Sequence, residues 1–160
     1  MILPLPKLNS KNLNQMITPY KGKFHVEWYD VTVSTEFTYG DAVTILSTSA
    51  GVGTLAKATD GSTAIYGLIQ QTISSTDSDY ATARKVPVLV GEADSKFLFD
   101  ISTGSAAQTD VGEMVGLDDE NSLDVTDYTE GPVRITDVIS TTQVVGKINK
   151  GFGLEIPITA

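Results

Sequence analysis

From Phe24 onward, the chain consists of short runs rich in β-branched and aromatic residues, separated by turn residues about every eight to twelve positions. Each run is long enough for one strand and too short for a helix of ordinary length. The sequence therefore predicts a mainly β fold, with a compact β-sandwich or barrel-like (β-tulip-like) body domain over residues 24–160. The expected strands cover residues 29–35, 42–47, 54–58, 64–71, 85–91, 96–101, 111–117, 133–139 and 142–148.

Two pairs of neighbouring runs are expected to form hairpins. Asp60 and Gly61 stand between two β-type runs, and an Asp-Gly pair favours a tight turn because it tolerates positive φ. This predicts a hairpin over residues 54–68. A second hairpin is expected over residues 133–148, where two alternating runs are joined by a short polar link.

Pro87 interrupts the apolar run of residues 86–90. Proline has no backbone donor for a strand ladder, so it is normally confined to edge strands, strand starts and bulges. The run is therefore predicted to form an edge strand.

Residues 1–23 differ in character from the rest of the chain. They contain three prolines, and their apolar residues follow no sustained period. Residues 1–26 carry four lysines and no acidic residue, although the whole chain has a net charge of −9. We expect an extended N-terminal arm over residues 1–23, with a short helix near residues 13–17 as an alternative. Since a fully extended arm could outreach a compact body, its apolar and basic residues are expected to contact a partner protein. The expected contact residues are Ile2, Leu3, Leu5, Lys7, Leu8, Lys11, Leu13, Met16, Ile17, Lys21 and Lys23.

Composition disfavours several classes of protein. The chain has no cysteine, which removes disulfides, thiolate nucleophiles and cysteine-bound zinc. The negative net charge disfavours binding to nucleic acid or to anionic lipid. No apolar run approaches the length of a membrane span, and the first residues lack the pattern of an export signal, so we expect a soluble protein without nucleic-acid or membrane partners.

Catalytic and cofactor motifs are not evident. His25 is the single histidine, it lies beside aromatic residues, and no nucleophile-elbow motif accompanies it. Residues 51–53 contain two glycines, but no lysine follows at the position that a phosphate loop requires and no helix is expected after them, so they are interpreted as a turn. We expect no enzymatic activity and no cofactor.

The acidic residues gather in two polar segments, residues 74–79 and 118–122, which are interpreted as solvated loops. A calcium site is the alternative. The spacing after Asp118 does not follow the EF-hand pattern, because Leu123 occupies the glycine position and Thr129 the glutamate position. The sequence therefore predicts no metal site. The carboxylates considered are Asp77, Asp79, Asp118, Asp119, Glu120 and Asp124.

Several aromatic residues lie close together near the start of the body. Alternating strand spacing indicates that most of them pack in the core and that some form one contact surface. These residues are Phe24, Trp28, Tyr29, Phe37 and Tyr39.

A proline-marked arm before a small β domain rich in Gly, Thr and Ser resembles the decoration (cement, or head-stabilising) proteins of tailed phages. The resemblance rests on residues 40–43 opening a strand, on residues 55–67 and on residues 88–93. It implies a homotrimer on the outer surface of the virion capsid, assembled in the host cytoplasm. It also implies that the arms lie on the major capsid protein and staple neighbouring capsomers.

Three other functions are compatible with the sequence. A tail, baseplate or fibre-associated virion protein would share this strand-rich composition. A carbohydrate-binding module would use Trp28, Tyr29 and Tyr39 with the acidic loops. A hydrolase would have to be built on His25 and ranks last.

Overall fold

The computed structural model describes residues 15–31, 33–46, 54–129 and 131–150. The protein is mainly β, as predicted, and the described residues contain one 3-10 helical turn, Gln108–Asp110. The strands are β1 (Ile17–Lys21), β2 (Phe24–Val31), β3 (Ala42–Leu46), β4 (Thr54–Lys57), β5 (Gly67–Ile69), β6 (Lys85–Gly91), β7 (Lys96–Thr103), β8 (Met114–Asp119), β9 (Ser122–Asp124), β10 (Val133–Ser140) and β11 (Gln143–Ile148).

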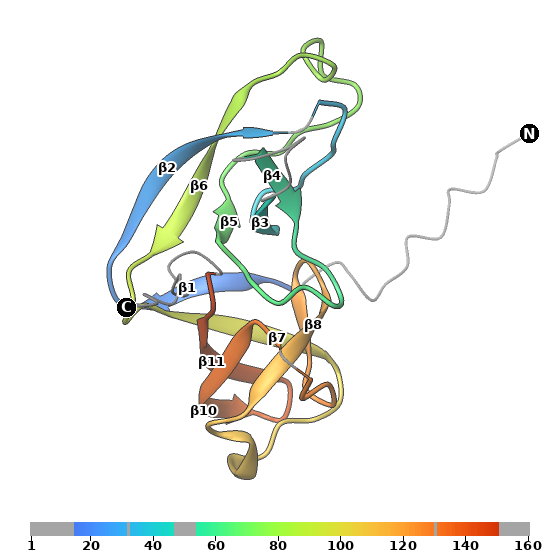
Figure 1. Cartoon of the computed structure of the whole chain (residues 1–160). Helices are drawn as coiled ribbons and strands as arrows, with labels where there is room; N and C mark the ends of the chain where they lie inside the picture. The colour runs from blue at the N-terminus through green and yellow to red at the C-terminus, as the bar shows by residue number, and fades with distance from the viewer. Residues whose placement is uncertain (1–14, 32, 47–53, 130, 151–160) are drawn as a thin grey trace, which may run out of the picture.

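The strands form two sheets, which lie one above the other in Figure 1. Each sheet closes on itself. The first barrel has the strand order β2-β4-β3-β5-β6, and it closes because β2 pairs with both β4 and β6. The second sheet has the order β1-β7-β11-β10-β8-β9. It closes because β9 also pairs with β7, and we call it the second barrel. Strand β1 is joined to this barrel only through β7 among the described pairings.

Period-two alternation explains why these runs form half-buried strands. In β6, Val86, Val88 and Val90 are buried, and the residues between them are partly exposed. In β7, Phe97 and Phe99 are buried in the same alternating manner. Each barrel interior is therefore filled by one face of its strands.

The two barrels share an apolar contact. Ala42 and Leu68 belong to strands of the first barrel, yet they pack in one cluster with the core of the second barrel. Backbone hydrogen bonds add to this contact, since Ala42 N donates to Glu120 O at 2.8 Å and Ile65 N donates to Asn149 O at 2.8 Å. The outer face of β3 and β5 is thus covered by the second barrel.

A buried carboxylate lies at the same contact. Asp41 is 1% exposed, and its Oδ2 accepts a hydrogen bond from Thr38 N at 2.8 Å and lies 3.4 Å from Lys57 Nζ. Lys57 Nζ also bonds Glu120 Oε1 of the second barrel at 2.8 Å. Burial alone would lower the pKa of Lys57, but the hydrogen bond to Glu120 and the charge of Asp41 outweigh it and raise the pKa. Lys57 therefore stays charged and bridges the two barrels.

The chain crosses between the barrels at two adjacent bends, β1 to β2 and β6 to β7. Lys23 O accepts hydrogen bonds from Ser95 Oγ at 2.6 Å and from Glu92 N at 3.0 Å, which joins the bends. Gly22 has a φ of +122°, a conformation that residues with a side chain rarely adopt. The two crossings therefore form one fixed joint.

The structure confirms the hairpin over residues 133–148, because β10 pairs antiparallel with β11 up to the pair Ser140 and Gln143. The hairpin over residues 54–68 is wrong. The predicted turn is present, with Ser62 N bonded to Thr59 O at 2.9 Å, but β3 lies between β4 and β5. The Asp60-Gly61 pair favours the local turn, whereas pairing with β3 on both sides keeps β4 and β5 from pairing with each other.

The edge-strand prediction for Pro87 is also wrong, because β6 pairs with β2 on one side and with β5 on the other. The carbonyl of Pro87 accepts a hydrogen bond from Gln70 N at 2.9 Å, so its polar groups point toward β5. Strand β5 ends at Ile69, and the missing donor of Pro87 therefore lies beyond the last pair of that ladder.

Two further expectations change. The acidic segment 118–122 is a tight turn between strands, since β8 extends to Asp119 and β9 begins at Ser122, which is fully buried. Residues 17–21 of the expected arm form β1, paired antiparallel with β7. Ile17 pairs with Phe99 and is 2% exposed, so the structure corrects its assignment as a partner contact and the idea of a helix at this residue. Its apolar side chain gains more from its own core than from exposure.

Candidate functional site

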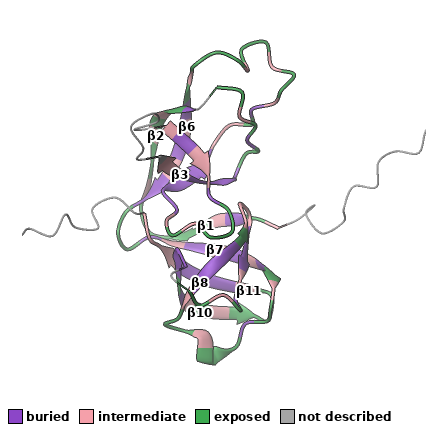
Figure 2. Cartoon of the chain, turned by 45° about the vertical axis from the view of Figure 1, so that its right-hand side comes forward, coloured by how far each residue is buried: buried purple, intermediate pink, exposed green. Residues whose placement is uncertain are grey.

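Strand β2 is the element with the most distinctive surface, because its two faces carry different chemistry. Odd-numbered residues face the first barrel and become more exposed from Val31, which is buried, to His25, which is exposed. Even-numbered residues face outward, and much of the strand is exposed in Figure 2. The candidate site therefore divides into an inner polar cluster and an outer apolar strip.

The inner cluster is centred on the Glu27 carboxylate. The hydroxyls of Tyr66 and Tyr29 donate to Glu27 Oε2 at 2.5 and 2.7 Å, and the two hydroxyl oxygens lie 2.7 Å apart. His25 Nε2 lies 2.7 Å from Glu27 Oε1. The tyrosine rings meet edge to face, with centroids 5.2 Å apart. Four side chains from β2 and from the segment before β5 are thus locked together.

The hydrogen bonds of this cluster shift the pKa values of Glu27 and Tyr66 in opposite directions. Hydrogen bonds from Tyr66, His25 and Tyr29 lower the pKa of Glu27 to about 2. Burial and the bond to Glu27 raise the pKa of Tyr66 well above its ordinary value. The carboxylate therefore stays ionised and the tyrosine stays protonated across the neutral range. The cluster links β2 to the segment before β5.

The outward face presents apolar side chains. Val26 is 51% exposed and lies opposite Leu89, and Trp28 is 60% exposed and lies opposite Pro87. Directly opposed residues on neighbouring strands project from the same face of a sheet and lie close together. We call this group the outer strip; it consists of Val26, Trp28, Pro87 and Leu89.

Two charged residues border the outer strip. Asp30 lies opposite Lys85, one step beyond the Trp28 and Pro87 pair, and both are exposed. On the other side, Leu89 pairs with Leu68, which is covered by the second barrel. The strip is therefore an uncovered part of the first barrel's outer face, bounded by a charge pair and by the contact between the barrels.

The aromatic residues expected near the start of the body separate into two groups. Phe37 is 1% exposed, and Phe24 packs edge to face on Phe97 with centroids 5.3 Å apart. Tyr39 is exposed and donates from its hydroxyl to Gln70 Oε1 at 3.2 Å. Trp28 is the aromatic residue of this group that projects from the outer strip.

Four of the expected arm contacts lie within the described residues. Met16 is 45% exposed, and its backbone N donates to Asp100 Oδ2 at 2.9 Å. Lys21 and Lys23 are exposed at the end of β1 and in the following bend. Ile17 is buried. The other predicted contacts lie outside the described residues: Ile2, Leu3, Leu5, Lys7, Leu8, Lys11 and Leu13.

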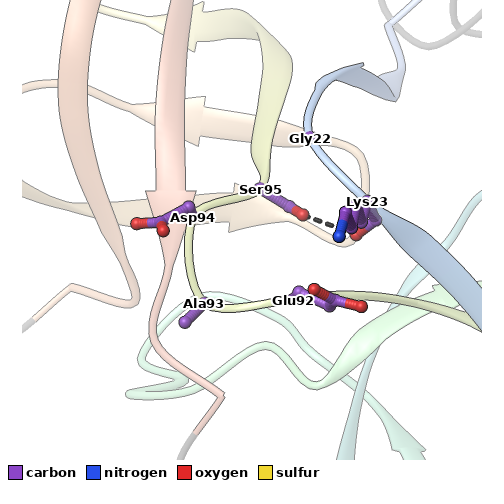
Figure 3. A pocket seen from close by; sticks show the side chains of 6 residues that line it. All are labelled: Gly22, Lys23, Glu92, Ala93, Asp94 and Ser95. Carbon is purple, nitrogen blue, oxygen red and sulfur yellow. Dashed lines mark hydrogen bonds between the residues drawn. The ribbon is translucent and has the colours of Figure 1, made fainter.

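A small depression of about 280 Å³ lies at the joint between the barrels (Figure 3). Its lining comes from the two crossing bends, where Ser95 Oγ is bonded to the backbone of Lys23. Nearby, Asp94 Oδ1 is bonded to Lys147 Nζ at 3.1 Å. These contacts join the bends, and we assign the depression to the joint. The lining residues are Gly22, Lys23, Glu92, Ala93, Asp94 and Ser95.

The carboxylates of the acidic segments take part in local hydrogen bonds and ion pairs. Asp77 accepts a bond from Ser74 N at 2.9 Å, and Arg84 bonds Asp79 at 2.5 Å. Asp124 Oδ1 accepts from the backbone N of Thr126 at 2.8 Å. Within the described ranges, no group of three or more His, Cys, Asp or Glu residues is arranged to hold a metal ion.

Sequence reasoning missed Val26, Pro87 and Leu89 as surface residues. Polar and apolar residues alternate over residues 25–28, which indicates a strand with one exposed face, but the predicted strand began only at Tyr29.

In the part of the chain that the structure covers, no helix is long and apolar enough to cross a membrane. Comparison with protein-family models, with curated proteins and with solved structures finds no match.

Proposed function

We propose that this chain is a non-enzymatic structural protein that binds the outer surface of a viral capsid as a homo-oligomer. It stabilises the shell through contacts between the N-terminal segment, residues 1–14, and the major capsid protein. The observation that carries the proposal is that β1, which directly follows this segment, is paired with β7 and packed on the second barrel. The resemblance to phage decoration proteins supplies the identity of the partner.

Strand β1 is suited to anchor residues 1–14 to the body of the protein. It is hydrogen-bonded to β7, and Ile17 is buried beside the aromatic core of the second barrel. A pull on residues 1–14 would therefore act on a sheet ladder and on a packed side chain. Fourteen residues in extended conformation span up to about 46 Å, which is enough to reach a neighbouring subunit.

The chemistry of residues 1–14 suits a protein surface. The segment contains apolar residues and two lysines, Lys7 and Lys11, and no acidic residue. Apolar side chains favour burial against a partner, and the lysines favour contact with acidic residues on the partner's surface. Several such segments on one oligomer bind cooperatively, because every contact after the first is intramolecular.

The test is co-sedimentation with empty expanded phage shells. The deletion should remove residues 1–14 and keep β1, since a longer deletion would expose the core around Ile17. We expect the shortened protein to stay folded by circular dichroism and to lose sedimentation with shells. Full occupancy by the shortened protein would refute the proposal, and binding to isolated tails in place of shells would favour a tail or baseplate protein.

A matched pair of variants separates apolar contact from chain length. Serine at Ile2, Leu3, Leu5 and Leu8 should abolish shell binding. Alanine at Ser10, Asn12 and Asn14 changes polar positions of the same segment and should leave binding largely intact. Equal loss in both variants would indicate that the apolar residues are not the contact.

Carbohydrate binding is the second candidate, favoured by the exposure of Trp28 on an open sheet face. Exposed aromatic rings of this kind offer a stacking surface for the apolar face of a sugar. A glycan array would detect it, with Trp28→Ala losing the signal and Tyr128→Ala, at an exposed aromatic residue outside the outer strip, keeping it. An array without signal for the unaltered protein excludes this function for the glycans tested.

A further inference from the structure

We infer that the outer strip is the self-association surface of this protein, and that it pairs with the outer strip of a second copy about a two-fold axis. The inference specifies the homo-oligomer of the proposed function as a two-fold dimer, in place of the homotrimer that the resemblance implies, and it rests on the proposed function for its biological role. Its test uses no capsid, so it can fail independently of capsid binding.

The outer strip is apolar enough to favour burial. Val26 and Trp28 are each more than half exposed, and Pro87 and Leu89 lie directly opposite them. The inner cluster around Glu27 lies on the opposite face of β2 and bonds this strand to Tyr66, so the backbone that carries Val26 and Trp28 is ordered. A backbone that is already ordered adds little to the entropy cost when a partner covers the strip.

The arrangement of the strip is self-complementary. A two-fold axis parallel to the strands, midway between β2 and β6, places β2 of one copy over β6 of the other. Trp28 then lies over Pro87 of the second copy, and Val26 lies over Leu89 of the second copy. An interface of this kind is isologous, so each contact occurs twice. Two sheets stacked in this way lie about 10 Å apart, a distance that apolar side chains fill.

Charge complementarity supports a second copy as the partner. The same axis places Asp30 over Lys85 of the second copy and Lys85 over Asp30 of the second copy. Both residues are exposed beside the apolar pairs, where an opposite charge would be attracted. Apolar contacts and charges therefore match under a single symmetry operation.

The chain carries its own reporter, because Trp28 is its single tryptophan. We expect the emission of Trp28 to shift to shorter wavelength as protein concentration rises, together with a sedimentation mass approaching twice the 17.0 kDa of the chain. Trp28→Asp and Leu89→Lys should sediment as monomers. Tyr39→Asp alters an exposed aromatic outside the strip and should associate as the unaltered protein does.

Charge reversal gives the decisive test. Asp30→Lys places two lysines opposite each other twice in the dimer, and Lys85→Asp places two aspartates opposite each other twice. Each variant alone should associate about tenfold or more weakly than the unaltered protein. A mixture of the two variants should form a heterodimer, because every cross-copy pair is then attractive. An effect confined to one chain would not be rescued by mixing.

Several results would overturn the inference. Monomeric mass at all concentrations would do so, as would a mass of three chains. Failure of the mixed variants to associate would exclude the proposed alignment. A short-wavelength emission that is independent of concentration in a monomer would show that the chain's own residues cover Trp28.

Discussion

Gly22 approaches Ser95 so closely that a Cβ built on Gly22 would lie 2.6 Å from Ser95 Cα. This contact joins the two bends at which the chain crosses between the barrels. Since the obstructing atom belongs to the backbone, a side chain at Gly22 could not be accommodated by rotating a neighbour.

Gly22→Ala is therefore expected to destabilise the protein more than an ordinary glycine substitution. Positive φ alone costs an alanine about 1–2 kcal/mol, and the close contact should add about 1–3 kcal/mol. Gly112→Ala is the control, because Gly112 has a φ of +100° and nothing lies within 4 Å of its built Cβ. Urea denaturation of both variants measures the difference, and equal losses would contradict the close contact.

Ile17→Ala should lower the free energy of unfolding by about 2–4 kcal/mol, because it leaves a cavity in the second barrel. Met16→Ala alters the neighbouring exposed side chain and should change stability by no more than about 0.5 kcal/mol. Both values come from denaturant titration. Similar small effects at the two positions would mean that β1 is not packed as described.

Asp41→Ala should lower the free energy of unfolding by about 2–3 kcal/mol, since it leaves Lys57 and the backbone donor of Thr38 without this carboxylate. The expected loss of stability is smaller than for a fully buried ion pair, because the Lys57 side chain is 31% exposed. Asp60→Ala, in an exposed turn, should change stability by no more than about 0.5 kcal/mol. Thermal or urea unfolding would reveal a mistaken assignment if Asp41→Ala behaved like the control.

Glu27 should make stability depend on pH in the acid range. Its pKa falls from 4.5 to about 2 on folding, so the folded state favours the ionised form. The stabilisation is fully present above pH 4.5 and is lost as pH falls toward 2. Denaturation midpoints measured across this interval should decline less steeply in Glu27→Gln than in the unaltered protein. Tyr66→Phe removes the strongest donor and should also reduce the decline; an unchanged pH profile in both variants would argue against the cluster.

Local patterns were sufficient to predict most of the strands. The alternation in residues 86–90 and the polar link near Ser140 depend only on neighbours in sequence, and the corresponding strands and hairpin are present. Strand β1 was not predicted, because Pro19 and the lack of a sustained period gave no strand signal. Its partner, β7, lies far along the chain.

The candidate site could be predicted only in part. The exposed aromatic surface was expected, but the sequence did not select Trp28 from the five aromatic residues considered. Alternation in β2 places Val26 and Trp28 on one face without deciding whether that face is covered. The covering of Leu68 by the second barrel, and the partial exposure of its neighbour Leu89, depend on how the two barrels meet.

The sequence by itself determined the mainly β class, the positions of most strands, the Asp60-Gly61 turn and the contrast between a basic first segment and an acidic remainder. These properties follow from backbone preferences and charge, which act over a few residues. Tertiary structure alone decided that β3 separates β4 from β5, that Pro87 lies in an interior strand and that Ile17 is buried. Pairing between distant strands is set by the burial and backbone bonding of the whole chain, and a local pattern is compatible with several such pairings.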